Sequence, residues 1–397
     1  MLVGATLEEQ LEDLLDESPQ AALRRERAAF DELAAPHGER LVLFGAGGLG
    51  RKTLAGLRRA CVEPLAFADN DTRLWGTVVE GLPVLAPAEA AERYGSRAAF
   101  VVAIWRAGST DVMGDRVRQL RELGCETVVT FAPLFWKHAD VLVPHYAVDL
   151  PHRALAQADA IRAVFPLWAD DASRAEFVAQ VRWRLHADFD ALPAPVGHEA
   201  YFPDDLVDLR PGEVVVDCGA YDGDTIRSLV RHDVATKGRI VAFEPDPANY
   251  KALQRYVETL PATMRKRIVL HPSAVGARDG TVRFDSSGTA SSAVGDGGAV
   301  VDCMRLDGVL DGSVPTCVKM DIEGSELGAL EGAAAVIRDA HPMMAVCAYH
   351  RQDHLWRVPA ALAGFTDQYR YYLRPHALEV WDLVCYAVPA SRLKILA

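Results

Sequence analysis

The sequence contains no apolar run longer than a buried β-strand, so it predicts no transmembrane helix and no membrane partner. Positive charge is also scarce: 42 Lys and Arg stand against 55 Asp and Glu, and the net charge of −13 argues against a nucleic-acid partner. No two of the seven cysteines form a Cys-x-x-Cys pair, and most lie in apolar runs, as buried thiols of a reducing compartment do. Because the first twenty residues are polar and lack a signal-peptide core, we expect a cytoplasmic protein.

The clearest strand–turn–helix unit is VVVDCGAYDGDT, at residues 214–225. Its apolar start predicts a buried parallel strand, and the glycines that follow predict a tight turn that lets a ligand approach the backbone. The glycine spacing is not that of the pyrophosphate fingerprint, and the turn carries two acids, Asp217 and Asp222. We therefore expect a cationic ligand, such as the sulfonium S-adenosylmethionine, rather than a bare polyphosphate.

Three further apolar runs, at residues 239–243, 267–271 and 317–320, also end in polar loops. The carboxyl ends of parallel strands meet at one edge of an open α/β sheet, and ligands bind at that edge. Glu244 ends the first of these runs, at the position where an acid accepts hydrogen bonds from ribose hydroxyls. The four loops together predict a binding site for an adenosine-bearing cofactor.

The segments VVVDCGAYDGDT, VAFEPDPANYKAL, HPSAVG and VKMDIEGSE resemble the core motifs of the FkbM-type S-adenosylmethionine-dependent methyltransferases, in that family's order. The resemblance covers residues 201–389, and the N-terminal half lies outside it. It implies a class I methyltransferase fold and O-methylation, often of sugars or of polyketide and other natural-product hydroxyls. For this chain we expect the acceptor to be a hydroxyl of a sugar, a nucleotide-sugar or a glycosylated natural product. It places cofactor roles on Asp217, Gly219, Asp222, Gly223, Thr225 and Glu244. To this cofactor site we add residues of the same loops: Ala220, Tyr221, Pro245, Ser273, Ala274 and Asp321.

Methyl transfer to an alcohol is an in-line displacement in which a group must take the proton of the acceptor oxygen. His350 ends the strand predicted at residues 343–350, and histidine is the common base near neutral pH. We expect His350 to be the base and Asp321 to orient it or the acceptor; the alternative is a histidine with a purely structural role. The predicted substrate-binding residues are Lys319, Glu323, His354 and Arg374, the last in a turn between strands at 371–374 and 378–388.

A divalent metal is a second way to activate the acceptor. Mg²⁺ or Mn²⁺ would find oxygen and imidazole ligands in Asp321, Glu323, His350, Asp353 and His354. The spacing of these residues is not diagnostic, so we predict no metal site.

A second glycine loop follows the apolar run at residues 41–44. Gly45, Gly47 and Gly50 satisfy G-x-G-x-x-G, and Asp69 ends the next predicted strand. The stretch LVLFGAGGLGRK…AFADNDTRLWGTVVEGLPVL resembles the N-terminal nucleotide-binding domain of some sugar-modifying enzymes. Two interpretations stay open, a nucleotide or nucleotide-sugar site and a fold that only supports the rest of the chain.

The pattern of elements predicts two doubly wound, Rossmann-like α/β domains joined by a helical bridge. We expect a helical arm at 1–36, broken near Ser18 and Pro19, a Rossmann-like domain at 37–145, a bridge and linker at 146–200, and a methyltransferase domain at 201–397. Residues 201–205 are expected to cover the cofactor edge, and a Gly- and Ser-rich loop at 286–298 either contacts substrate or forms a surface turn.

The leading hypothesis is an S-adenosylmethionine-dependent O-methyltransferase with a sugar-containing small-molecule acceptor, and such a protein could form a homo-oligomer. The alternatives are a nucleotide-dependent oxidoreductase that uses the N-terminal glycine loop and a non-catalytic nucleotide-sugar-binding protein.

Overall fold

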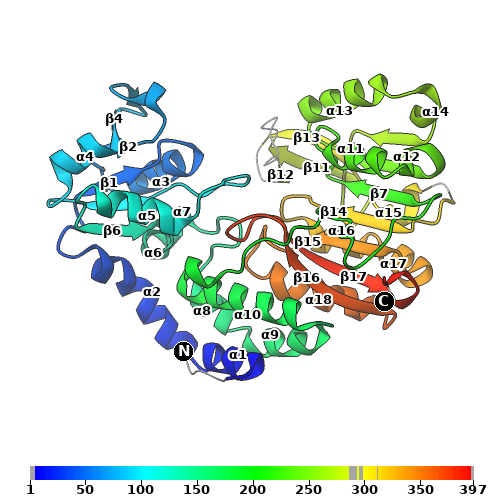
Figure 1. Cartoon of the computed structure of the whole chain (residues 1–397), viewed down its shortest axis with the longest axis horizontal. Helices are drawn as coiled ribbons and strands as arrows, with labels where there is room; N and C mark the ends of the chain where they lie inside the picture. The colour runs from blue at the N-terminus through cyan, green and yellow to red at the C-terminus, as the bar shows by residue number, and fades with distance from the viewer. Residues whose placement is uncertain (1–4, 286–292, 295–297, 311, 395–397) are drawn as a thin grey trace. The chain divides into compact units, whose positions relative to one another are not determined.

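The computed structural model describes residues 5–285, 293–294, 298–310 and 312–394. The chain divides into two compact units: unit 1 is Met1–Asp159, Ala175–Pro195 and Ala377–Trp381, and unit 2 is Ala160–Arg174, Val196–His376 and Asp382–Ala397. Figure 1 shows an α/β sheet in each unit, which confirms the predicted fold class. Of the predicted loop at 286–298, only residues 293–294 and 298 lie within the described residues. No helix in this described part is long and apolar enough to cross a membrane.

The N-terminal arm consists of helices α1 (Leu7–Leu15) and α2 (Pro19–Ala34), separated where the sequence predicts a break. Thr6 caps α1 in a capping box with Glu9. The Ser18 side chain accepts a hydrogen bond from the Ala21 amide, and Pro19 takes the first helical position, where its missing N–H has no partner to lose. The arm belongs to unit 1 together with the predicted Rossmann-like segment, whereas the predicted bridge at 146–200 is divided between the two units.

The sheet of unit 1 has the order β3-β4-β2-β1-β5-β6. Its strands are β1 (Leu41–Phe44), β2 (Ala66–Ala68), β3 (Val78–Val79), β4 (Leu82–Leu85), β5 (Ala99–Val102) and β6 (Thr127–Thr130). All neighbours are parallel except β3 and β4. The apolar runs of β1, β2 and β5 are buried throughout, as expected for strands covered on both faces.

The helices between these strands are α3 (Gly48–Arg59), α4 (Pro87–Tyr94) and α5 (Met113–Glu122). Helix α3 begins at Gly48, inside the glycine motif. After β6 come α6 (Phe131–Lys137), α7 (Ala139–Leu142), α8 (Pro151–Leu155), α9 (Ala158–Val164) and α10 (Asp171–His186). These five helices follow one another in the segment between the two sheets in the sequence.

The main sheet of unit 2 has the order β16-β17-β15-β14-β7-β8-β9. Its strands are β7 (Val214–Cys218), β8 (Arg239–Phe243), β9 (Ile268–His271), β14 (Cys317–Met320), β15 (Met343–Cys347), β16 (Tyr369–Pro375) and β17 (Leu383–Pro389). The five strands from β15 to β9 in the sheet order are parallel, and β17 is antiparallel to both of its neighbours. The predicted loops after β7, β8, β9 and β14 therefore do share one edge of the sheet.

The described helices that follow β7 in the chain lie mostly between these strands in the sequence (Figure 1). They are α11 (Asp224–Arg231), α12 (Val234–Lys237), α13 (Pro247–Thr259), α14 (Ala262–Arg265), α15 (Leu306–Val309), α16 (Glu326–Glu331), α17 (Ala334–Ala340) and α18 (His354–Phe365). A smaller sheet with the order β10-β13-β11-β12 is formed by β10 (Ser273–Val275), β11 (Gly280–Asp285), β12 (Ala293–Val294) and β13 (Ala299–Met304).

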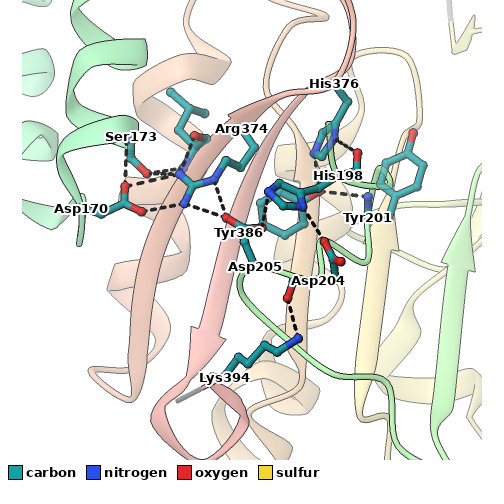
Figure 2. Close-up of polar contacts among 11 residues, drawn as sticks. Asp170, Ser173, His198, Tyr201, Asp204, Asp205, Arg374, His376, Tyr386 and Lys394 are labelled. Atoms are coloured by element: carbon teal, nitrogen blue, oxygen red, sulfur yellow. Dashed lines mark hydrogen bonds and ion pairs between the residues drawn. The ribbon is translucent and has the colours of Figure 1, made fainter. Parts of the chain in front are cut away.

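Arg374 lies within β16 and not in a turn, which corrects the sequence prediction. Its side chain is buried and donates hydrogen bonds to Asp170 (2.6 Å), Asp205 (3.2 Å) and the Ser173 hydroxyl (2.8 Å), as Figure 2 shows. With these partners the guanidinium anchors two segments that precede the sheet in sequence. The predicted second run at 378–388 also differs, since β17 starts only at Leu383.

Replacement of Arg374 by alanine should lower the unfolding free energy of unit 2 by about 3 kcal/mol, because Asp170 and Asp205 would lose the cation that compensates their burial. Arg370 lies on the same strand with an exposed side chain, so Arg370→Ala should stay within about 0.5 kcal/mol of the wild type. Denaturant unfolding of the full chain measures both variants. Equal losses in the two would show that Arg374 is not an anchor.

Candidate active site

A pocket of about 700 Å³ lies at the carboxyl edge of the main sheet of unit 2. It is lined by the loops after β7, β8 and β14 and by β10 and β11, through Gly219, Tyr221, Asp224, Phe243, Glu244, Pro245, Asn249, Ser273, Ala274, Val275, Phe284, Asp321, Ile322, Glu323 and Ser325. Seven of the predicted cofactor residues are among them: Gly219, Tyr221, Glu244, Pro245, Ser273, Ala274 and Asp321. The pocket therefore forms where the strand ends predict a ligand.

Gly219 brings the loop after β7 against the loop after β14. Its φ is +83°, in the left-handed region, and a Cβ at this position would lie 1.9 Å from the Asp321 carbonyl oxygen. Glycine is the one residue that allows both the conformation and the contact. The pocket wall next to Asp321 depends on this close approach.

Asp217 and Lys319 are used inside the sheet and do not line the pocket. The Asp217 carboxylate is 3.0 Å from the Lys319 ammonium, and both side chains are almost completely buried. Lys319 also donates to the Gly219 carbonyl oxygen. The structure thus gives these two residues a supporting role in place of the direct cofactor and substrate contacts expected from the sequence.

Gly219 and Tyr221 line the pocket, but the other predicted residues of this turn do not. Asp222 pairs with Arg227 at 2.7 Å, and Ala220, Gly223 and Thr225 are buried away from the lining. The acid that reaches the pocket is Asp224, which the sequence analysis did not select. Its position in the sequence could have indicated this role, because Asp224 directly follows the glycine turn and is the first residue of α11.

Glu244 faces the pocket and holds two backbone segments. One carboxylate oxygen accepts the Tyr221 amide and the other accepts the Asp246 amide, each at 2.8 Å. Burial raises the pKa of Glu244 to about 7, although these two hydrogen bonds oppose the shift. Each oxygen keeps a second lone pair for a ligand hydroxyl.

Ser273 is buried in the pocket lining, and its hydroxyl has no hydrogen-bond partner among the described residues. A buried polar group without a partner carries a desolvation cost. A ligand with a donor or acceptor at this point would remove that cost.

Charged side chains form a connected group beside the pocket. His350 Nε2 lies 3.2 Å from Asp321, and His350 Nδ1 lies 2.7 Å from Glu326. His354, predicted to bind substrate, is buried and contacts the second Glu326 oxygen at 3.2 Å. The loop after β14 and the start of α18 are therefore held together by histidine–carboxylate contacts.

The carboxylates decide the charge of His350. Burial alone would lower its pKa, but Glu326 and the hydrogen bond to Asp321 raise that pKa well above its usual range. For Asp321, burial is likewise outweighed, and His350 lowers the pKa to about 2. The direction of this shift favours the protonated form of His350, whereas the sequence analysis expects His350 to accept a proton.

Two nearby carboxyls have raised pKa values, in contrast to Asp321. Glu323 has a left-handed backbone, with φ +53°, and lines the pocket 3.8 Å from His350 Nε2. Burial raises its pKa to about 7. Burial and the charge of Asp321 raise the pKa of Asp382 to about 6. The sequence analysis missed Asp382 because this residue lies directly before β17, far from Asp321 in the sequence.

Tyr201 belongs to the segment predicted to cover the cofactor edge. Its hydroxyl donates to Asp321 at 2.8 Å, and its ring lies 5.2 Å from the Lys319 ammonium. Its backbone amide donates to the Tyr386 hydroxyl at 2.9 Å, a contact drawn in Figure 2. Tyr201 thus fixes the orientation of one Asp321 oxygen.

In the described part of the chain, no group of three or more His, Cys, Asp or Glu side chains is arranged to hold a metal ion. Of the residues considered as metal ligands, Asp321 and His350 contact each other, His354 contacts Glu326, and Asp353 pairs with Arg357.

Comparison with known proteins agrees with this geometry. Residues 217–376 match the family model of the methyltransferase FkbM domain. A methyltransferase FkbM from Methylobacillus flagellatus KT has a similar structure, with a TM-score of 0.77 and 23% identity over 96% of this chain and 99% of that one. No curated protein matches the chain.

More remote structures align with less than half of this chain. A precorrin-6y C5,15-methyltransferase from Geobacter metallireducens GS-15 has a TM-score of 0.29 and 13% identity, over 46% of this chain and 84% of its own. Aeropyrum pernix fibrillarin, solved with natively bound S-adenosyl-L-methionine, has a TM-score of 0.27 and 15% identity, over 45% and 67%. The family match covers residues 217–376, the part of the chain that holds the pocket, and this part is therefore similar to the methyltransferase FkbM domain.

Proposed function

We propose that unit 2 transfers a methyl group from S-adenosylmethionine to a hydroxyl of a sugar-bearing small molecule. The observation that carries the proposal is the acid-lined pocket at the sheet edge of the segment that matches the methyltransferase FkbM domain, with Glu244, Asp321 and Glu323 in its lining. When bound, the cofactor supplies an electrophilic methyl group on a sulfonium.

The pocket residues fit such a cofactor. The Glu244 carboxylate is placed to accept hydrogen bonds from ribose hydroxyls. The unpartnered Ser273 hydroxyl faces the same space and offers a hydrogen bond to the adenine. Asp224 and Asp321 add negative charge, which stabilises a ligand with a sulfonium and an amino group.

The lining also favours one class of acceptor. Four of the described lining residues are carboxylic acids, namely Asp224, Glu244, Asp321 and Glu323. The described lining contains no Lys or Arg. A phosphate group near these acids would be repelled, whereas sugar hydroxyls donate hydrogen bonds to them. The pocket therefore supports the neutral sugar part of an acceptor at the reacting position.

Glu323 is placed to take the acceptor proton. A base works best when its pKa lies near the working pH, and the Glu323 pKa of about 7 meets this condition, whereas Asp321 with a pKa of about 2 does not. The charged His350 holds Asp321 in position and lowers the pKa of Glu323 by its charge. In the transfer, the acceptor oxygen forms the bond to the methyl carbon, the carbon–sulfur bond breaks, and the oxygen's proton passes to Glu323.

The test of the function is incubation of the full chain with methyl-labelled S-adenosylmethionine and a panel of sugars, glycosides and nucleotide-sugars, beside matched amino sugars. We expect label on an oxygen of a sugar hydroxyl. Label confined to the amine nitrogens would contradict the proposed O-methylation, and no transfer to any of these acceptors would contradict the sugar class.

Glu244→Gln should weaken the binding of S-adenosylhomocysteine by about 1–3 kcal/mol, because the amide is a weaker acceptor for the ribose hydroxyls. Since the pKa of Glu244 is about 7 and its carboxylate form is the better acceptor, wild-type affinity should increase as the pH rises through 7. Calorimetry measures both effects, with the exposed Glu258→Gln as the control in the same unit. An affinity of Glu244→Gln equal to that of the control would remove Glu244 from the site.

Glu323→Gln should lower the turnover by about 10²- to 10⁴-fold and leave cofactor binding in place. The wild-type rate should rise with pH as Glu323 loses its proton near 7, and this inflection should vanish in the variant. His350→Gln gives the contrast, because removal of a positive charge raises the pKa of Glu323 and moves the inflection to higher pH. An inflection that vanishes in His350→Gln and persists in Glu323→Gln would make His350 the base.

A further inference from the structure

Unit 1 contains a cavity of its own, with about 970 Å³ of space at the carboxyl edge of its sheet. The loops after β1, β2 and β5 form its walls. In the sheet, β1 lies between β2 and β5 and is parallel to both. The chain passes from β1 to β2 on one side, and β5 is added on the other side. This is the point where the strand order reverses, and ligands of open α/β sheets bind there.

Two glycines of the loop after β1 are required by the fold. Gly45 has a φ of +118°, and a Cβ there would lie 2.7 Å from the Ala103 carbonyl oxygen. A Cβ on Gly50 would lie 1.8 Å from the Gly45 carbonyl oxygen. These contacts explain both glycines without any ligand.

The other two glycines have no such explanation. A Cβ on Gly47 or Gly48 would meet nothing within 4 Å, and neither residue has a positive φ. Both are exposed and line the cavity. Glycine is tolerated at an N-cap, the position of Gly47, but it has a low helix propensity, and Gly48 is the first residue of α3. The two open positions keep the backbone accessible to something outside the chain.

The polar groups of the cavity suit a phosphorylated nucleoside. Within the described residues, the amides of Gly47, Gly48 and Leu49 have no hydrogen-bond acceptor, and they open the twelve-residue helix α3 toward the cavity. Asp69, at the end of β2, accepts the Ala46 amide at 2.6 Å and the Asp71 amide at 2.7 Å. Each of its oxygens keeps a lone pair for a ribose hydroxyl.

We propose that this cavity of unit 1 binds a nucleoside diphosphate with an unmodified ribose, its phosphates over Gly47 and Gly48 and its ribose at Asp69. A nucleotide-sugar and a dinucleotide share this chemistry. Ile104 and Leu74 give the cavity apolar wall for the base. The site is independent of the methyl-transfer pocket, whose residues all belong to unit 2.

The first test is calorimetric titration of the full chain with UDP-glucose and with NAD⁺, and with S-adenosylhomocysteine in parallel. We expect one of the two nucleotides to bind, which identifies the source of the diphosphate. If neither binds even at millimolar concentration, the proposal is overturned, whatever the result with S-adenosylhomocysteine.

Gly48→Glu separates a ligand site from a structural loop. An acid in the first turn of α3 favours the helix, so the variant should fold at least as well as the wild type. Its charge would lie where the phosphates bind, and the affinity for the nucleotide should fall at least tenfold while that for S-adenosylhomocysteine is unchanged. Gly364→Glu is the matched control, at an exposed glycine of α18 with equally open surroundings. Unchanged nucleotide affinity in Gly48→Glu would overturn the proposal.

NADP⁺ tests the ribose contact if the dinucleotide binds. Its additional phosphate on the ribose would meet the Asp69 carboxylate, so it should bind at least tenfold more weakly than NAD⁺. Equal affinities would overturn the placement of the ribose at Asp69.

Discussion

The ion pair between Asp217 and Lys319 holds the centre of unit 2 together. The two residues face each other in the register of β7 and β14, and their charges lie 3.0 Å apart with almost no exposure to water. A buried charge is stable only when it is paired and hydrogen-bonded, and Lys319 meets this condition through Asp217 and the Gly219 carbonyl. Two of the loops that line the pocket, those after β7 and β14, start from these strands, so the position of this part of the wall depends on the pair.

A second charge pattern controls the chemistry beside it. Glu326 and Asp321 raise the pKa of His350, and His350 in turn lowers the pKa of Asp321 to about 2. Glu323 lies 3.8 Å from His350, whose charge lowers the Glu323 pKa. Burial raises this pKa more strongly, to about 7. The two carboxyls beside His350 therefore differ, because the pKa of Asp321 is about 2 and that of Glu323 is about 7.

The glycine loops of the two units solve different problems. Gly219 is needed because the loop after β14 touches its backbone, and the same holds for Gly45 and Gly50 in unit 1. Gly47 and Gly48 have only open space around them. A glycine motif read from sequence does not separate these cases, because the distinction lies in what a side chain would contact.

Local sequence signals are enough to predict the helices, the strands and the sheet edge where the pocket lies. Long apolar runs such as β7 and β14 and the break at Pro19 are local signals, since burial on both faces and helix capping leave their mark within a few residues. Only the tertiary structure decided which charged side chains reach the pocket. Arg374 pairs with Asp170, which is distant in sequence, and the pKa of His350 depends on partners from another loop. Charge partners come together only when the chain folds, so their identity and their protonation cannot be read from the pattern of any one segment.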